Sequence, residues 1–166
     1  METRRRFARL VEPLAADLMA AAYRLTGDRA DAEELTQETL VSAYKGIGKL
    51  NDTGSIRGWV FTIMKNGWRS RLRRADRRWP TVRDPATVER IADPNVVDPT
   101  DAGFDDRAQA ALMTLPEEIR ELLVAREVAD MRYDEIAAAF GLPLGTVKSR
   151  IARGREKLKA AWLAGE

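Results

Sequence analysis

The chain has 166 residues, a formal net charge of +2, and neither Cys nor His. The lack of cysteine excludes disulfides and thiol chemistry, and the lack of histidine removes the commonest general base and metal ligand. Hydrophobic residues make up 45% of the chain, which suffices for a packed core, and no apolar run reaches the roughly 18 residues of a membrane span. The N-terminus METRRRFARLVEP lacks the apolar core of a signal peptide, so we expect a cytoplasmic protein without membrane insertion.

The first part of the chain predicts three helical segments. Apolar residues spaced three and four apart predict a helix or helix pair over 4–25, which Thr26-Gly27 ends. Asp28 is the expected N-cap of a second helix that runs to about Tyr44. After a loop at 48–55, Ser55 is placed to cap a long helix over about 56–74.

The second of these helices carries a polar row formed by Glu34, Gln37 and Glu38, and Val41 lies on the same side. Such a row is most often simply solvated, and a metal site is disfavoured because no His and no turn-type oxygen ligands accompany it. A docking face for a basic partner is the third interpretation, and the spacing alone does not choose among them.

The long third helix carries a basic row at a spacing of four, formed by Lys65, Arg69 and Arg73, with Asn66 beside it. A solvated face is the plain interpretation, but a basic row next to an amide and a loop favours a groove for single-stranded nucleic acid. Trp59 and Trp68 on this helix are expected to be core residues.

The helical pattern ends between about 76 and 104, where four of the seven prolines lie. This composition predicts a flexible linker. We therefore predict an all-α protein with two small helical domains, residues 1–75 and 105–166, joined by a linker at 76–104.

The C-terminal part contains a predicted helix-turn-helix over 133–159. Gly141 lies where the first helix should end, and Pro143 suits the first turn of the second helix. The second helix directs Val147 and Ile151 inward and is rich in basic residues on its other sides. A solvated basic helix in an ordinary bundle is the alternative, but the turn chemistry favours a helix that enters the major groove of DNA.

Two motifs in this order give the chain a resemblance to the extracytoplasmic-function (ECF) group of bacterial RNA polymerase sigma factors. GDRADAEELTQETLVSAY at 27–44 and SIRGWVFTIMKN at 55–66 resemble region 2 of that family. LPEEIRELL at 115–123 and YDEIAAAFGLPLGTVKSRIARGREKL at 133–158 resemble its region 4. The resemblance covers nearly the whole chain apart from the linker.

The resemblance implies three sets of contact residues. Docking on the coiled coil of the polymerase β′ subunit maps to Glu34, Gln37, Glu38, Leu40 and Tyr44. Reading of the −10 element, including a flipped-out base, maps to Leu50, Asn51, Asp52, Thr53, Gly54, Ser55, Lys65, Asn66, Arg69 and Arg73. Reading of the −35 element maps to Thr146, Lys148, Ser149, Arg150, Ala152, Arg153 and Arg155.

The sequence departs from the family pattern at two places in the part that resembles region 4. Arg132 stands where many members have Ser before the helix-turn-helix, so a cap is lost and a charge gained. Ala152 stands where some members have a larger side chain, which affects the expected base preference.

We therefore expect a transcription initiation factor that is not an enzyme and needs no cofactor, metal or small-molecule substrate. Its expected partners are core RNA polymerase (the β′ coiled coil and the β flap), promoter DNA and, by family analogy, an anti-sigma factor. Two rival hypotheses are a free-standing helix-turn-helix regulator and a nucleic-acid enzyme acting through Asp31, Glu34 and Glu38. The first leaves residues 28–74 without a role, and metal-dependent cleavage would support the second.

Overall fold

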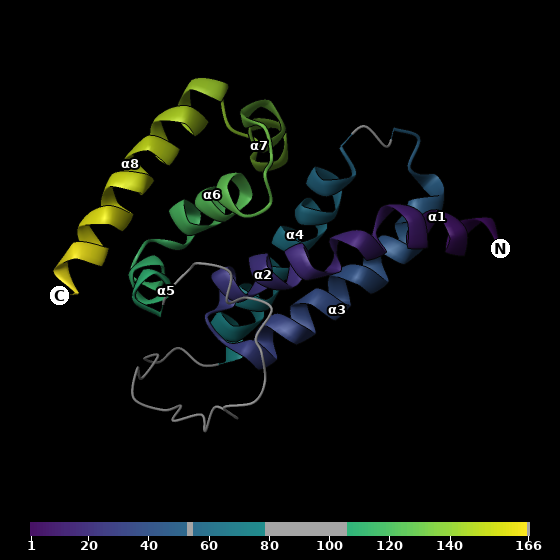
Figure 1. The fold of residues 1–166 in the computed structure, drawn as a ribbon, viewed down its shortest axis with the longest axis horizontal. Coiled ribbons are helices and arrows are strands. Elements are labelled where there is room, and N and C mark those ends of the chain that lie inside the picture. Colours follow the sequence, from purple (N-terminus) through teal and green to yellow (C-terminus); the bar gives the residue numbers. More distant parts are fainter. Residues whose placement is uncertain (53–54, 79–105, 166) are drawn as a thin grey trace.

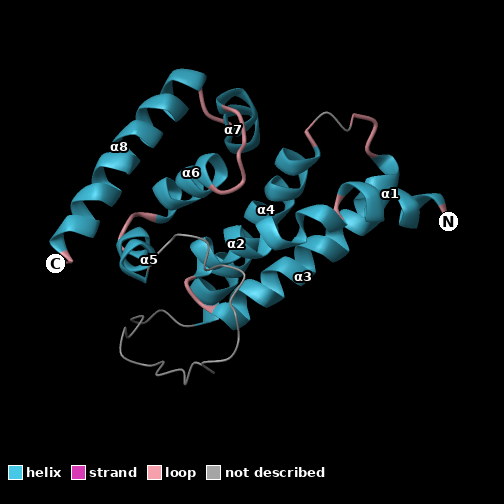
Figure 2. Cartoon of the chain, viewed as in Figure 1, coloured by secondary structure: helices cyan, strands magenta, loops and turns pink. Residues whose placement is uncertain are grey.

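The protein is described by a computed structural model that covers residues 1–52, 55–78 and 106–165. These residues form helices and connecting turns without any strand, which confirms the all-α prediction (Figure 1, Figure 2). The helices are α1 (Glu2–Leu10), α2 (Ala15–Thr26), α3 (Arg29–Gly46), α4 (Ile56–Arg78), α5 (Asp106–Met113), α6 (Glu117–Glu127), α7 (Tyr133–Phe140) and α8 (Leu144–Ala164). Short 3-10 turns lie at Glu12–Leu14 and Ile47–Lys49.

Local chemistry sets several helix ends where the sequence predicted them. Gly27 ends α2 with a φ of 67°, and Gly141 ends α7 with a φ of 62°, a backbone region that glycine enters without steric cost. The Asp28 carboxylate accepts a hydrogen bond from the backbone N–H of Asp31 at 2.9 Å and so caps α3. The predicted caps at these three residues are thus confirmed.

Helices α1 to α4 form an N-terminal unit in which α3 packs between α2 and α4. Its centre contains Leu25, Leu35 and Met64, all with no exposed surface. Phe61 and Trp68 are also buried, whereas Trp59, which was predicted to be a core residue like Trp68, is half-buried against the core. Because α4 is covered on more than one side, its buried surface is wider than the single apolar stripe of an ordinary surface helix.

Helices α5 to α8 form a C-terminal unit in which α8 packs across α5, α6 and α7. Val147 and Ile151 of α8 are fully buried, as predicted. Gly154 is buried as well. It lies so close to α6 that a Cβ added there would be 2.8 Å from Cγ2 of Ile119. The close contact between α8 and α6 therefore depends on a residue without a side chain.

The two units pack against each other, and their buried apolar residues form one continuous cluster. Arg120 of α6 is buried and donates hydrogen bonds to the carbonyl oxygens of Leu112 and of Leu25 in the other unit. Arg24 donates to the side chain of Gln109 at 3.0 Å. The sequence predicted two units on a tether but not this contact between them.

The predicted domain boundary at 75–76 lies within α4, which continues to Arg78. Residues 79–104 of the predicted linker lie outside the described residues.

Candidate nucleic-acid interface

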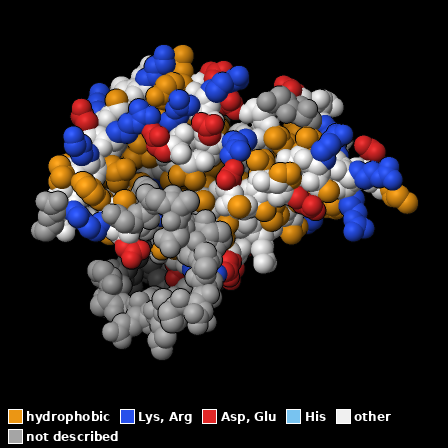
Figure 3. Space-filling model, in the orientation of Figure 1, with side chains coloured by type: hydrophobic (Ala, Val, Ile, Leu, Met, Phe, Trp, Pro, Cys, Tyr) orange, Lys and Arg blue, Asp and Glu red, His pale blue; other side chains and the backbone are white. Residues whose placement is uncertain are grey.

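The outer side of α8 exposes the residues predicted to read duplex DNA. Lys148, Ala152 and Arg153 are exposed, while Val147 and Ile151 are directed into the core. Figure 3 shows Lys and Arg side chains gathered over this end of the C-terminal unit, and again at the N-terminal end over α1. The helix therefore presents a basic face on the side opposite its buried residues, as a groove-binding helix requires.

The other residues of α8 that were predicted to contact DNA are either half-buried or already paired within the protein. Thr146, Ser149 and Arg150 are half-buried, and the Ser149 hydroxyl donates to the backbone oxygen of Thr146 at 3.1 Å. Arg155 donates to the Glu127 carboxylate at 2.6 Å, and this hydrogen bond raises the pKa of its guanidinium. A phosphate that binds Arg155 would have to compete with Glu127.

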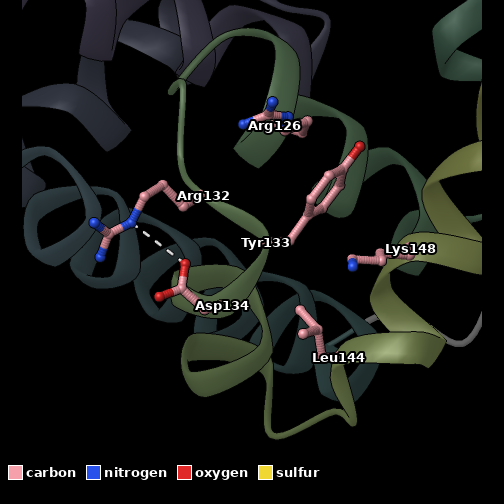
Figure 4. Close-up of a pocket in the computed structure, with 6 residues that line it drawn as sticks. All are labelled: Arg126, Arg132, Tyr133, Asp134, Leu144 and Lys148. Carbon is pink, nitrogen blue, oxygen red and sulfur yellow. Dashed lines mark ion pairs between the residues drawn. The ribbon is translucent and has the colours of Figure 1, made fainter.

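A hollow of about 360 Å³ lies between the start of α8 and the turn before α7. Figure 4 shows Tyr133 between Arg126 and Lys148, with Leu144 below its ring. The Arg126 guanidinium lies 4.7 Å from the centre of the Tyr133 ring, which fixes both side chains. Arg126, Arg132 and Lys148 line this hollow together with Asp134, and cations in such a position suit a phosphate of the DNA backbone.

Neither Arg126 nor Tyr133 was predicted from the sequence to contact DNA. Arg126 belongs to α6, a helix outside the helix-turn-helix, whereas Tyr133 is the first residue of the predicted helix-turn-helix.

The polar row on α3 is solvent-exposed, as a docking face requires. Glu34, Gln37 and Glu38 are all exposed, and Tyr44 is 43% exposed further along the same helix. Leu40 is half-buried. The Tyr44 ring is held by an edge-to-face contact with Phe7, with 5.3 Å between the ring centres.

Two further residues complete this surface. Val41 is 53% exposed and adds an apolar side chain next to the acidic row. Arg71 of α4 donates to Glu38 at 2.9 Å and lies 3.3 Å from Glu34. These carboxylates raise the pKa of Arg71 and are in turn partly neutralised by it. The residue spacing had placed Val41 on the same side of the helix as the polar row, whereas nothing in the spacing indicated Arg71.

The loop after α3 is held at both ends. Arg6 of α1 donates to the backbone oxygen of Leu50, and the Ser55 hydroxyl donates to Glu135 of α7. Asn51 and Asp52 between them are exposed. The predicted contact residues Thr53 and Gly54 lie outside the described residues.

The basic row of α4 is divided between solvent and the contact between the units. Asn66 and Arg73 are exposed, but Lys65 is only 3% exposed and donates to the backbone oxygen of Ala139. Arg69 donates to both carboxylate oxygens of Glu121, from Nε at 3.1 Å and from Nη2 at 2.7 Å. Burial lowers the pKa of Lys65, whereas the hydrogen bond to Glu121 raises that of Arg69. Three of the predicted −10 residues, Ser55, Lys65 and Arg69, thus contact the C-terminal unit.

Within the described residues, no group of three or more His, Cys, Asp or Glu side chains is arranged to hold a metal ion. No helix among them is long and apolar enough to cross a membrane.

Comparisons with known proteins give the same two-part division. Residues 10–78 match the family "Sigma-70 region 2", and residues 105–158 match "Sigma-70, region 4". The ECF RNA polymerase sigma factor SigE of Mycolicibacterium smegmatis is 38% identical over 145 residues, which are 83% of this chain and 54% of SigE. EcfG of Rhodopseudomonas palustris, also an ECF RNA polymerase sigma factor, is 32% identical over 86% of this chain and 77% of its own length.

A solved structure has a similar fold over nearly the same length. The sigma factor RpoE in complex with the anti-sigma factor NepR, from Bartonella quintana, superimposes with a TM-score of 0.75 at 26% identity. The match covers 93% of this chain and 95% of that one. The chain thus spans about half the length of SigE but almost the whole of RpoE.

Proposed function

Because this chain belongs to the ECF group of RNA polymerase sigma factors, the initiation factors that direct the polymerase to promoters, we propose that it binds core RNA polymerase and reads a two-part promoter. The observation that carries the proposal is the order of the two matched regions. An N-terminal unit with an exposed acidic helix is followed by a helix-turn-helix with an exposed basic face. A free-standing regulator would need only the second.

In this proposal α8 reads the −35 element in the major groove. The exposed Lys148 and Arg153 contact base edges in this proposal, where a good two-point contact contributes about 1–3 kcal/mol of discrimination. Ala152 suits the methyl group of a thymine. Arg150, Arg155 and the hollow around Tyr133 then hold phosphates, which position the helix without reading sequence.

The N-terminal unit reads and melts the −10 element. Asn66 and the loop from Leu50 to Ser55 take up an extruded base, and Lys65, Arg69 and Arg73 follow the backbone of the single strand. Arg6 is a positioning residue, because its hydrogen bond to the Leu50 carbonyl fixes the start of the loop.

The acidic face of α3 is the docking surface for core polymerase, on the β′ coiled coil, and the C-terminal unit meets the β flap. Glu34, Gln37 and Glu38 supply charge and hydrogen bonds, and Val41, Leu40 and Tyr44 supply the apolar contact. Complementary charge of this kind favours fast and specific association.

Members of this family are generally non-catalytic, and we propose that this chain is too, with neither cofactor nor small-molecule substrate. It would act in the cytoplasm, where the polymerase and the chromosome are. RpoE binds an anti-sigma factor, and we extend that kind of partner to this chain.

Co-elution with core bacterial RNA polymerase on size exclusion tests the proposal without knowledge of the promoter. We expect stoichiometric co-elution of the wild type and about tenfold weaker binding of Glu38→Gln, equivalent to ~1.4 kcal/mol. Glu33→Gln is the matched control, because Glu33 is an exposed carboxylate of the same helix that pairs with Arg29 and is not among the assigned docking residues. Binding to duplex DNA without co-elution would instead favour a free-standing regulator. Equal binding by Glu38→Gln and Glu33→Gln would remove the α3 assignment.

A further inference from the structure

The first helix, α1, exposes a row of arginines on one side and packs its apolar residues on the other. Phe7 and Leu10 are half-buried against the core, whereas Arg4, Arg5 and Arg9 are exposed. With about 3.6 residues per turn, the three arginines lie on the side of the helix opposite Phe7 and Leu10. None of the three makes an ion pair within the described residues. Their charge contributes to the basic surface at this end of the molecule (Figure 3).

This arginine row lies beside the start of the loop that we assign to the −10 element. Helix α1 packs on α3 and on the 3-10 turn Ile47–Lys49 that follows it (Figure 1). The Phe7 ring contacts Tyr44 near the end of α3, and Arg6 donates to the backbone oxygen of Leu50, where the loop begins. The aromatic contact and the hydrogen bond therefore fix the arginine row in position relative to the loop.

The chemistry of this face fits phosphates better than a protein or a membrane. Between Arg4 and Arg9 its only apolar side chain is Ala8, so it lacks the apolar anchors that Val41 and Tyr44 give the docking face of α3. The larger apolar residues of α1 pack into the protein, which leaves no apolar face to insert into a lipid surface. A guanidinium group, by contrast, binds phosphate oxygens through two donors at once.

We propose that Arg4, Arg5 and Arg9 form a further DNA-binding surface, which contacts backbone phosphates of the promoter where it borders the −10 element. The inference rests on the proposed function, because it takes the −10 element as the DNA that the neighbouring loop holds. These contacts add affinity without reading sequence, since the phosphates are the same at every base pair. They also fix the register of the promoter relative to the loop.

The salt dependence of promoter binding tests the proposal. The probe is a duplex that the holoenzyme, the complex of this chain with core polymerase, selects from a random-sequence pool. Each phosphate contact contributes about −0.9 to the slope of log K against log salt concentration. The triple variant Arg4→Gln/Arg5→Gln/Arg9→Gln should therefore have a slope shallower by about 2–3 and bind about tenfold or more weakly at about 0.1 M salt. The loss should be the same when the base pairs next to the −10 element are changed.

Arg29→Gln is the matched control, because Arg29 is an exposed arginine of the same unit. It is the first residue of α3, whose 18 residues place it about 27 Å from the end on which α1 packs. We expect this variant to keep the wild-type slope. A change of slope per lost charge equal to that of the triple variant would reveal only an effect of net charge and would overturn the proposal.

A single introduced thiol locates the DNA without removing any arginine, because the chain contains no other cysteine. Ala8 is exposed within the arginine row, and Ala30 is exposed at the far end of α3. An iron chelate attached to Ala8→Cys should cleave the DNA backbone next to the −10 element in the holoenzyme complex, whereas the same chelate on Ala30→Cys should not cleave there. Absence of cleavage from Ala8→Cys, or equal cleavage from Ala30→Cys, would overturn the proposal.

The remaining outcomes separate this inference from the proposed function. If the wild-type chain neither co-elutes with polymerase nor selects a duplex with it, the proposed function fails and the inference fails with it. A selected duplex that the triple variant binds with the wild-type slope overturns the α1 contact alone. Loss of polymerase co-elution by the triple variant would assign the arginines to an acidic surface of the polymerase, and would also overturn the DNA contact.

Discussion

Replacing Gly154 with alanine tests whether α8 needs its close approach to α6. The added Cβ would lie 2.8 Å from Cγ2 of Ile119 and 3.4 Å from both terminal methyl groups of Leu123. Cγ2 is attached directly to the β-carbon of a branched side chain, so it cannot move away without shifting the α6 backbone or changing the rotamer. We therefore expect α8 to be displaced and the C-terminal unit to be destabilised.

The size of the effect follows from two opposing terms. Overpacking a well-filled contact costs about 1–3 kcal/mol, whereas replacing glycine with alanine inside a helix gains ~1 kcal/mol. The net change for Gly154→Ala is thus a loss of up to about 2 kcal/mol. In a chain of this size each kcal/mol changes the melting temperature by roughly 2–4 °C.

Gly145→Ala is the matched control, because Gly145 lies on the same helix and a Cβ added there meets no atom within 4 Å. It gains helix propensity without overpacking, so we expect it to be slightly more stable than the wild type. Thermal melts of the three full-length proteins, followed by circular dichroism, give the comparison. A Gly154→Ala protein as stable as Gly145→Ala would refute the argument that α8 and α6 need this close contact.

Three further predictions concern the assigned contact residues. Arg153→Ala should weaken binding to a cognate −35 duplex by about 1–3 kcal/mol in fluorescence anisotropy; an equal loss on scrambled duplex, with a shallower salt dependence, would make it a phosphate contact instead. Asn66→Ala should raise the free energy of promoter opening by about 1–2 kcal/mol, measured by the permanganate reactivity of unpaired thymines. A normal open complex would contradict the role of Asn66 in melting. Lys65 has a folded pKa below its ordinary 10.5, so the unfolded chain binds this proton more tightly and stability should rise as pH approaches 10.5 from below. Urea titrations over that range should show the rise in the wild type and a smaller one in Lys65→Met; identical slopes would show that Lys65 is not buried in solution.

The helices and their ends were largely predictable, because they depend on neighbours in the sequence. Asp28 caps α3 through a residue three positions away, and Gly27 and Gly141 end helices by their own backbone freedom. The outward basic face of α8 followed in the same way from the inward spacing of Val147 and Ile151.

The contact residues that came from other helices were not predictable in this way. Arg71 meets Glu34 and Glu38 across the packing of α4 on α3, and Arg126 reaches Tyr133 from α6. No spacing along the chain encodes either contact, because each depends on how two helices cross.

The sequence by itself determined that this protein is helical, which helix carries the acidic row and which helix carries the basic face, since these are properties of residue spacing along single helices. Only the tertiary structure decided where the basic row of α4 points. Lys65 and Arg69 repeat at a spacing of four, as a solvated row would, yet both contact the C-terminal unit, which lies more than fifty residues away along the chain. Spacing places side chains on one side of a helix, but the packing of the two units determines what that side contacts.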